Sequence, residues 1–249
     1  MKIDTGKFYS GTSNVVLPVP NKQLFPEAFK DKSHLNYYAS LFNSVEINYS
    51  FYKVPMPFTI RKWSEDVLEE FRFTFKLWRE ITHQKGLEFQ PKDVERFMRV
   101  IGHAGNKKGC LLVQFPPGLQ VNYIHKVENL LTVIRSCDTG NEWKIAVEFR
   151  HRSWYKESVY DMFRNYNMGI VFHDLPASAT PMIESFSDFV YLRFHGPDGG
   201  YKGSYTDDFL YEYAGYIRDW QQEGKTVYAY FNNTMGEAVK NLTTLNDFM

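Results

Sequence analysis

The sequence predicts an α/β fold, a single (β/α)8 TIM barrel, from two observations. Short runs rich in β-branched and aromatic residues alternate eight times with longer segments whose apolar residues recur every three or four positions. This alternation is typical of parallel strands connected by crossover helices. The 249 residues also match the size of one closed barrel, which commonly uses about 250. We therefore expect residues 1–249 to form one barrel domain.

Eight segments have the composition of strands, being short and rich in Val, Ile, Phe or Tyr. The predicted strands cover residues 7–12, 44–49, 71–76, 109–115, 144–150, 169–173, 189–195 and 226–232. The connections between them have the length of crossovers, so we expect every pair of neighbouring strands to be parallel.

The helices are recognised by their apolar spacing. In residues 122–136 four apolar side chains fall on one face, and residues 207–223 repeat the pattern and stop before Gly224. The other predicted helices cover residues 33–42, 57–69, 91–101, 155–166 and 237–247. The sixth connection, residues 175–187, contains Pro and Ser and gives only a weak helical signal.

Composition argues against several classes of protein. The 29 Lys and Arg residues balance the 29 Asp and Glu residues, so the broad positive field of a nucleic-acid coat protein is missing. A hydrophobic content of 43% is ample for a core and excludes a disordered chain. The two cysteines, Cys110 and Cys137, indicate neither a disulfide framework nor a zinc site.

We also expect a cytoplasmic protein with no membrane partner. The opening segment MKIDTGKFYSGTSN lacks the charged-then-apolar layout of a secretory signal. The longest strongly apolar runs, such as residues 110–115, are too short to cross a bilayer.

Polar residues occupy inward positions at the carboxyl ends of the predicted strands. Side chains alternate along a strand, so Val45 and Ile47 facing the helices leave Glu46 and Asn48 inside. The same alternation directs further polar side chains into the barrel mouth: Lys76, Gln114, Glu148, Arg150, His173, Arg193, His195 and Asn232. Burying so many polar groups is costly unless they pair or bind something, which predicts a binding or catalytic pocket where barrel enzymes carry theirs.

The two inward carboxylates, Glu46 and Glu148, allow two interpretations. In a catalytic pair, Lys76 or Arg150 would hold one ionised while a drier neighbourhood keeps the other protonated, as in glycosidases. In a structural role they would form internal ion pairs, Glu46 with Lys76 and Glu148 with Arg150 or Arg193. Both interpretations stay open at this level.

The inward cations and imidazoles point to ligand binding and proton transfer. Lys76, Arg150 and Arg193 together suit an anionic group such as phosphate or carboxylate, because arginine offers bidentate donors. His173 and His195 are the side chains expected to titrate near neutral pH, with His195 as the proton carrier.

A metal site is a weaker alternative. Acceptable ligands exist in Glu46, Glu148, His173, Asp174 and His195, but no HxH or HExxH spacing ties them together. We therefore assign no metal ligand and no cofactor. The sequence also lacks GxGxxG, GxxxxGK[ST] and GxSxG in a strand-to-helix setting, so Rossmann, P-loop and serine-hydrolase functions are unsupported.

Three further sets complete the candidates. His83 follows the third strand, where it could bind substrate or, with Thr82, cap the loop. Asn232 and Asn233 lead into a Thr and Gly turn; they could donate to a substrate oxygen, and capping is the favoured role for Asn233. Aromatic residues near the mouth could stack on a sugar or base or pack in the core: Tyr49, Phe51, Tyr52, Trp78, Trp154, Tyr201 and Tyr205.

Seven phrases near the strand ends form a recognisable set: SVEINYSFYKVP (44–55), FRFTFK with ITH (71–83), LLVQFPPG (111–118), AVEFRHRSWY (146–155), FVYLRFHG (189–196), YKGSY (201–205) and YFNNT (230–234). Together they resemble the YecE-like family, domain of unknown function seventy-two. The resemblance runs nearly end to end and implies a TIM barrel, but the family's activity is not established.

The resemblance also implies a set of site residues: Glu46, Asn48, Lys76, His83, Gln114, Glu148, Arg150, Arg193, His195, Asn232 and Asn233. The first loop departs from the family pattern, because GTSNVV and then QLFPEAF stand where members have Gly and Trp and a Trp-containing stretch. We expect the part of the pocket wall that this loop supplies to differ.

These observations favour an enzyme of hydrolase or lyase type acting on a small phosphate-bearing or polyhydroxylated substrate. Glu46 or Glu148 would be the general acid or base, and the three cations would clamp the anion. One alternative is a nucleic-acid-binding protein similar to barrel endonucleases, with or without a metal, and with a basic rim of Lys53, Arg61, Lys62, Arg79 and Lys85. Another is a non-catalytic binder of a small anionic or sugar-like ligand.

Overall fold

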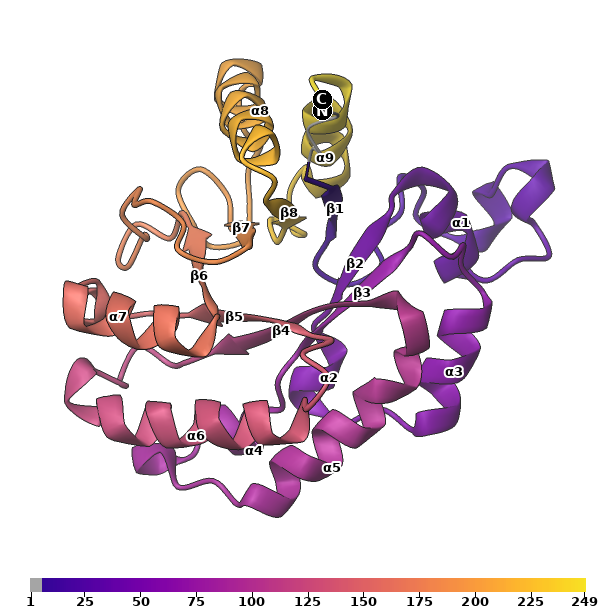
Figure 1. The fold of residues 1–249 in the computed structure, drawn as a ribbon. Helices are drawn as coiled ribbons and strands as arrows, with labels where there is room; N and C mark the ends of the chain where they lie inside the picture. The colour runs from indigo at the N-terminus through magenta and orange to yellow at the C-terminus, as the bar shows by residue number, and fades with distance from the viewer. Residues whose placement is uncertain (1–5) are drawn as a thin grey trace, which may run out of the picture.

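The computed structural model describes residues 6–249, in which eight parallel strands form a nearly closed barrel with helices around it, a (β/α)8 TIM barrel (Figure 1). The strands are β1 Phe8–Thr12, β2 Ser44–Ile47, β3 Arg72–Lys76, β4 Lys108–Gln114, β5 Lys144–Glu148, β6 Gly169–His173, β7 Phe189–Phe194 and β8 Thr226–Phe231. Their order in the sheet is β1-β8-β7-β6-β5-β4-β3-β2. The predicted fold class is confirmed.

The barrel closes where β1 meets β2, through a parallel bridge between Ser13 and Glu46. Gly11 permits this approach, because a Cβ atom at Gly11 would lie 2.0 Å from the carbonyl oxygen of Ser44. Hydrogen bonds from side chains replace part of the backbone hydrogen bonding between β1 and β2. The backbone N–H of Thr12 donates to the hydroxyl of Tyr38 at 2.7 Å. The seam therefore fixes the loop that follows β1 over the barrel mouth.

The helices are α1 His34–Leu41, α2 Tyr49–Tyr52, α3 Pro57–Glu65, α4 Arg79–Thr82, α5 Pro91–Ile101, α6 Ile124–Cys137, α7 Glu157–Tyr166, α8 Asp207–Gln222 and α9 Ala238–Asp247. Short 3-10 helices add η1 Lys22–Leu24, η2 Glu27–Phe29, η3 Lys85–Leu87, η4 Gly102–Lys107, η5 Val121–Tyr123 and η6 Arg152–Trp154. The connection from β6 to β7 contains no helix, in agreement with its weak helical signal.

Two differences from the predicted elements affect the mouth. The predicted strand 44–49 ends at Ile47, because Asn48 has helical backbone angles and α2 begins at Tyr49. A second short helix, α4, follows β3. One-turn helices are too short to show an apolar period, so the sequence pattern did not indicate them.

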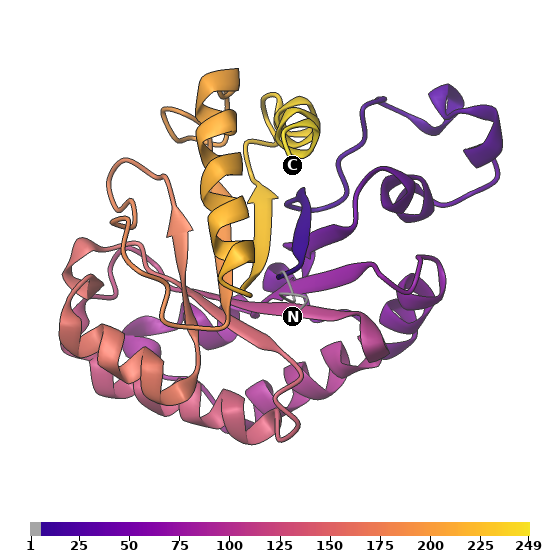
Figure 2. The same cartoon turned by 45° about the horizontal axis from the view of Figure 1, so that its top comes forward.

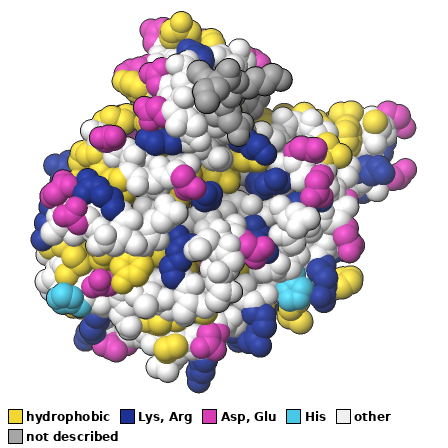
Figure 3. Space-filling model, viewed as in Figure 1, with side chains coloured by type: hydrophobic (Ala, Val, Ile, Leu, Met, Phe, Trp, Pro, Cys, Tyr) yellow, Lys and Arg dark blue, Asp and Glu magenta, His cyan; other side chains and the backbone are white. Residues whose placement is uncertain are grey.

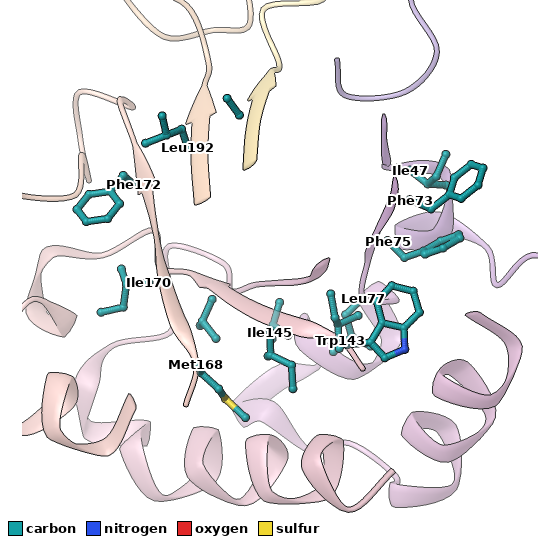
Figure 4. Close-up of a cluster of buried hydrophobic side chains, with 14 of the residues drawn as sticks. Ile47, Phe73, Phe75, Leu77, Trp143, Ile145, Met168, Ile170, Phe172 and Leu192 are labelled. Carbon is teal, nitrogen blue, oxygen red and sulfur yellow. The ribbon is translucent and has the colours of Figure 1, made fainter. Parts of the chain in front are cut away.

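The main core lies between the outer face of the strands and the helices. Figure 4 shows Ile47, Phe73 and Phe75 on this face, with Ile145 and Met168 on the side of the strands that faces the helices. All five are buried. The alternation predicted for β2, with Val45 and Ile47 outside and Glu46 inside, is therefore correct.

A second, smaller cluster fills the inside of the barrel below the mouth. Its members are Tyr9, Cys110, Leu112, Ala146, Val171, Phe189, Tyr191, Tyr228 and Tyr230. These side chains close the lower barrel as in other barrels of this type, where the interior is packed rather than hollow. Polar groups are concentrated above this inner cluster, at the carboxyl ends of the strands.

The outer surface carries charges of both signs. On the face shown in Figure 3, Lys and Arg side chains lie interspersed with Asp and Glu side chains. The loop between β1 and α1 projects beyond the barrel wall (Figure 2). Within residues 6–249, no helix combines the length and apolar character needed to span a membrane.

Candidate functional site

Arg193 occupies the centre of the barrel mouth, between two carboxylates from other strands. From β7, its Nη2 donates to Oε1 of Glu46 at 2.8 Å and its Nε to Oε2 at 3.0 Å. Its Nη1 donates to Oε2 of Glu148 at 3.0 Å. The three side chains are almost completely buried. One guanidinium therefore compensates part of both carboxylate charges.

Both carboxylates are ionised in this arrangement. Burial alone would raise the pKa of Glu46, but Arg193 and the hydroxyls of Ser13 and Tyr191, each 2.5 Å away, bring the pKa below its ordinary value. Burial would also raise the pKa of Glu148, but Arg150 and Arg193 hold it well below its ordinary value. The expectation that a drier neighbourhood keeps one of the two protonated is wrong.

The alternative interpretation, in which Glu46 and Glu148 form internal ion pairs, is correct for Glu148 but wrong in pairing Glu46 with Lys76. Glu46 pairs with Arg193, while Glu148 pairs with both Arg150 and Arg193. The planar fork of an arginine can donate to two carboxylates at once, whereas a lysine ammonium is a point charge. The pairing expected between Glu148 and the two arginines is present.

His195 lies behind the two arginines with no exposed surface. Its Nε2 is 3.2 Å from Nη2 of Arg150 and 3.2 Å from Nη1 of Arg193. Guanidinium groups only donate, so Nε2 accepts and the ring proton lies on Nδ1, which faces Oδ1 of Asp174 at 3.3 Å. Burial lowers the pKa of His195 to about 4, against the hydrogen bond to Asp174. The ring is therefore neutral at pH 7. The expectation that His195 titrates near neutral pH is wrong.

His173 has a fixed position at the end of β6. Its Nε2 lies 2.9 Å from the carbonyl oxygen of Phe149, and its Nδ1 accepts from the N–H of Leu175 at 3.3 Å. Burial lowers the pKa of His173. With both ring nitrogens bonded to backbone, His173 connects the ends of β5 and β6 instead of facing a ligand.

A cavity of about 310 Å³ opens over this cluster at the carboxyl ends of the strands. Its lining includes three cationic and three amide side chains: Lys76, Arg150, Arg193, Asn14, Asn48 and Asn232. The remaining lining residues are Ser13, Phe51, Tyr52, Tyr201, Thr234 and Met235. Among the described residues, no carboxylate lines it, because Glu46 and Glu148 are covered by the arginines.

A larger hollow, of about 650 Å³, lies at the opposite end of the barrel near Lys108 and Trp143, where β4 and β5 begin. In TIM barrels the amino ends of the strands contribute stability and the carboxyl ends carry the chemistry. The cavity at the mouth is therefore the candidate site.

Lys76 differs from the two arginines that share the cavity. Within residues 6–249 its Nζ has neither a hydrogen bond nor an ion pair, and it stands 4.2 Å from the centroid of the Phe51 ring. Burial lowers the pKa of Lys76 most, Arg193 adds to this and Glu148 opposes it, and together they bring the pKa to about 7. The amine is therefore available in both its charged and its neutral form around pH 7.

Gln114 and His83, both predicted to bind substrate, lie outside the cavity lining. Nε2 of Gln114 donates to the carbonyl oxygen of Phe115 at 2.5 Å. Nδ1 of His83 lies 2.8 Å from the hydroxyl of Thr82, and the ring packs edge-on against Phe51. His83 thus supports a wall of the cavity from behind.

Asn233 also lies outside the lining, although Asn232 is part of it. Nδ2 of Asn233 donates to the carbonyl oxygen of Gly203 and to Oδ1 of Asn241, both at 3.0 Å. Asn233 therefore joins the loop after β7 to α9. This structural role is closer to the capping expected for Asn233 than to ligand binding.

The expected aromatic residues divide in the same way. Phe51, Tyr52 and Tyr201 line the cavity. The others lie outside the lining: Tyr49, Trp78, Trp154 and Tyr205. Trp154 is a core residue, fully buried and stacked on Phe149.

The sequence interpretation missed four lining residues: Ser13, Asn14, Thr234 and Met235. Asn14 has φ 63°, a left-handed conformation that asparagine tolerates, and its Oδ1 accepts from the N–H groups of Asn48 and Tyr49. Position was the available signal, because all four lie within four residues of the carboxyl end of β1 or β8.

Metal binding finds no support in the side-chain arrangement. Within the described part of the chain, no three His, Cys, Asp or Glu side chains are placed to hold a metal ion. The carboxylates of Glu46 and Glu148 are engaged by Arg193 and Arg150 instead.

Comparison with known proteins identifies the family. The profile described as "Protein of unknown function DUF72" matches residues 9–249, from within β1 through α9. The chain belongs to the DUF72 family. It is 27% identical over 244 residues to the UPF0759 protein YunF of Bacillus subtilis (strain 168). This alignment covers 86% of this chain and 85% of YunF. It is also 27% identical over 121 residues to the UPF0759 protein YecE of Escherichia coli (strain K12), 49% of this chain and 43% of YecE.

Two solved DUF72 structures have the same fold. A protein of Thermotoga maritima superposes with a TM-score of 0.77 and 25% identity, over 97% of this chain and 98% of that one. A protein of Enterococcus faecalis V583 superposes with a TM-score of 0.75 and 19% identity, over 97% and 94%. These comparisons confirm the resemblance to the YecE-like family and the barrel fold of this DUF72 protein.

Proposed function

We propose that this DUF72 protein is an enzyme, of lyase or hydrolase type, that acts on a small phosphate-bearing, polyhydroxylated substrate at the barrel mouth. The observation that carries the proposal is the composition of the cavity lining, in which three cations and three amides converge without a carboxylate among the described residues. Such a set suits an anion more than a neutral or cationic ligand.

The charge balance of the mouth supports an anionic ligand. Each buried carboxylate, Glu46 and Glu148, has an arginine partner in Arg193 and Arg150. Lys76 has no such partner within residues 6–249, so its protonated form adds a positive charge at the cavity wall. A phosphate or carboxylate group entering the cavity would compensate this charge.

Other parts of the lining suit hydroxyl groups and a ring. The amides of Asn14, Asn48 and Asn232 can each donate to and accept from hydroxyls. Tyr52 and Tyr201 are exposed at the mouth and offer faces for stacking. The volume of about 310 Å³ is at the lower end for small-molecule sites and fits a metabolite better than a polymer.

The carboxylates have a defined part in this proposal. Glu46 and Glu148 hold Arg193 and Arg150 in position through the ion pairs described above. A substrate anion that draws Arg150 away from Glu148 would leave Glu148 paired with Arg193 alone and raise its pKa toward the range of a general base.

The test is a ligand screen by thermal shift with matched pairs, a sugar phosphate and the same sugar without phosphate. We expect the phosphate esters to raise the melting midpoint, and Asn232→Ala to reduce that rise while Asn106→Ala, at an exposed position, does not. Equal shifts with neutral sugars would count against the proposal. Salt-sensitive oligonucleotide binding, lost when Lys53 and Arg79 are changed to Ala, would favour the nucleic-acid alternative instead.

We also propose the cytoplasm as the location. Both cysteines, the buried Cys110 and the half-buried Cys137, are free thiols, as a reducing compartment allows.

A further inference from the structure

Two buried lysines, Lys76 and Lys107, have opposite surroundings. Nζ of Lys107 donates to the carbonyl oxygens of Ser64 at 2.5 Å and Val67 at 2.7 Å, as expected of a structural ammonium group. Within residues 6–249, Nζ of Lys76 has no such acceptor, and the side chain lines the cavity. The packing of the fold therefore explains Lys107 but not Lys76.

The surroundings of Lys76 favour both of its protonation states near neutral pH. The titratable and charged groups facing it are Arg193, Arg150, Glu148, Glu46 and His83. Burial and the two arginines favour the neutral amine, while the two carboxylates favour the ammonium, and the balance brings the pKa to about 7. The ring of Phe51, 4.2 Å from Nζ, holds the side chain against the cavity wall.

We infer that Lys76 is the nucleophile of this cavity and forms an imine with the carbonyl carbon of an aldehyde or ketone that also carries a phosphate or carboxylate. The inference rests on the proposed anion-binding function and narrows its substrate class. A lysine is activated as a nucleophile when it is desolvated beside another cation, which is the setting that Arg193 creates here.

Arg150 is placed to bind the anionic group of the same substrate. Its Nε is engaged by Glu148 and its Nη2 lies 3.2 Å from Nε2 of His195. Its Nη1 has no hydrogen-bond partner among the described residues, and the side chain lines the cavity beside Lys76. One substrate can thus meet a nucleophile on β3 and a cation that follows the end of β5.

The proposed step is balanced without a redox partner. The neutral amine of Lys76 attacks the carbonyl carbon, the N–C bond forms, and the carbonyl π pair moves to oxygen. A proton passes from the nitrogen to that oxygen and gives a carbinolamine. The C–O bond then breaks and the oxygen leaves as water with a proton from the solvent. The protonated imine keeps the positive charge that the ammonium carried, so the charge balance of the mouth is preserved.

The amides of Asn48 and Asn232 are available to hold the departing oxygen, since both line the cavity. The protonated imine draws electrons from the neighbouring C–C or C–H bond. A lyase or isomerisation reaction next to a carbonyl is therefore the class of chemistry that this lysine would support.

The experiment is reductive trapping. The protein is incubated with glyceraldehyde 3-phosphate and sodium cyanoborohydride, which reduces a protonated imine in preference to an aldehyde, at pH 7, and adducts are assigned by peptide mass spectrometry. At pH 7 a lysine of pKa about 7 is half neutral, against about one in three thousand for an ordinary lysine. We expect labelling of Lys76 to exceed that of any other lysine by roughly tenfold or more. Its rate should level off above about pH 7, while surface lysines continue to accelerate.

Two variants separate the inference from the proposed function. Lys76→Arg keeps the charge, so it should retain the thermal shift with sugar phosphates and lose the trapped adduct at this position. Lys53→Arg, at an exposed position, should retain both. A wild-type protein that binds sugar phosphates but is labelled no faster at Lys76 than at its surface lysines overturns the inference and leaves the proposed function standing. Absence of both binding and labelling overturns both.

Discussion

The guanidinium of Arg193 binds the carboxylate of Glu46 across the inside of the barrel, with Nη2 2.8 Å from Oε1 and Nε 3.0 Å from Oε2. The two residues come from β7 and β2, which are not neighbours in the sheet. Because Arg193 also donates to Glu148 on β5, one side chain connects three strands at the mouth. The same contacts cover both carboxylates and leave the cavity with a cationic lining.

We expect Arg193→Met to destabilise the protein strongly. The substitution leaves Glu46 without an ion-pair partner in the described residues and Glu148 with Arg150 alone. Removing one partner of a buried ion pair typically costs about 3–5 kcal/mol, because an uncompensated charge remains buried. The free energy of unfolding, measured by urea denaturation at pH 7, should fall by that amount.

Arg164→Met is the matched control for the Arg193 substitution. Arg164 also contacts two carboxylates, at 2.7 Å from Glu157 and 2.5 Å from Asp161, but its side chain is 44% exposed. Exposed pairs contribute roughly 0–1 kcal/mol. Similar losses for the two variants would contradict the importance given to the buried cluster.

The seam between β1 and β2 gives a second prediction, in which two Gly→Ala substitutions have opposite effects. At Gly11 a Cβ atom would lie 2.0 Å from the carbonyl oxygen of Ser44, so Gly11→Ala must push the two strands apart. At Gly215, inside α8, nothing lies within 4 Å of the position of a Cβ atom. Gly215→Ala should stabilise the protein by about 0.5–1 kcal/mol, since alanine is the better helix former.

Thermal unfolding monitored by circular dichroism checks this pair. Gly11→Ala should lower the melting midpoint clearly, whereas Gly215→Ala should raise it slightly. A tolerated Gly11→Ala would mean that the strands at the seam are farther apart than described.

The strands and their inward faces could be predicted from sequence because both follow from local repeats. Once Val45 and Ile47 are assigned to the helix-facing side, the period of two leaves Glu46 inside. The structure has this register, with Ile47 in the outer core and Glu46 buried among the mouth residues. The resemblance to the YecE-like family supported the same fold independently.

The partner of Glu46 could not be predicted, because it depends on distances across the barrel. The structural interpretation of the sequence paired Glu46 with Lys76 on the adjacent strand, whereas in the structure it pairs with Arg193 on a distant strand. The choice follows from the reach of the arginine and the width of the barrel, and neither leaves a local signal. The protonation state of His195 was hidden in the same way, because it depends first on burial and then on the two guanidinium groups that face its Nε2.

Lys76 should reduce the stability of the folded protein in a pH-dependent way. Its pKa of about 7 in the folded state lies below the 10.5 of an ordinary lysine. The folded state therefore pays the full cost of burying the ammonium below pH 7, and this cost disappears as the pH rises toward 10.5. We expect Lys76→Met to raise the free energy of unfolding by on the order of 1–3 kcal/mol at pH 6, with a gain that shrinks between pH 7 and pH 10.

Denaturation curves at several pH values test this expectation, with Lys53→Met at an exposed position as the control. The control should change stability little and equally at every pH. A stabilisation by Lys76→Met that does not vary with pH would indicate better packing of the methionine instead of relief of a buried charge.

The last prediction concerns the pH dependence of ligand affinity. Only the ammonium form of Lys76 attracts an anion, so the affinity for a sugar phosphate should fall as the pH rises from 7 to 9. This pH range also lies above the second ionisation of the phosphate, which has a pKa of about 6. That ionisation adds negative charge to the ligand and would raise its affinity as the pH rises. Calorimetry should show a decrease of roughly tenfold for the wild-type protein, about 1.4 kcal/mol. Lys76→Arg stays charged throughout this range and should bind with constant affinity, whereas Lys76→Met should bind weakly at both ends. An unchanged slope in both variants would assign the pH dependence to a group other than Lys76.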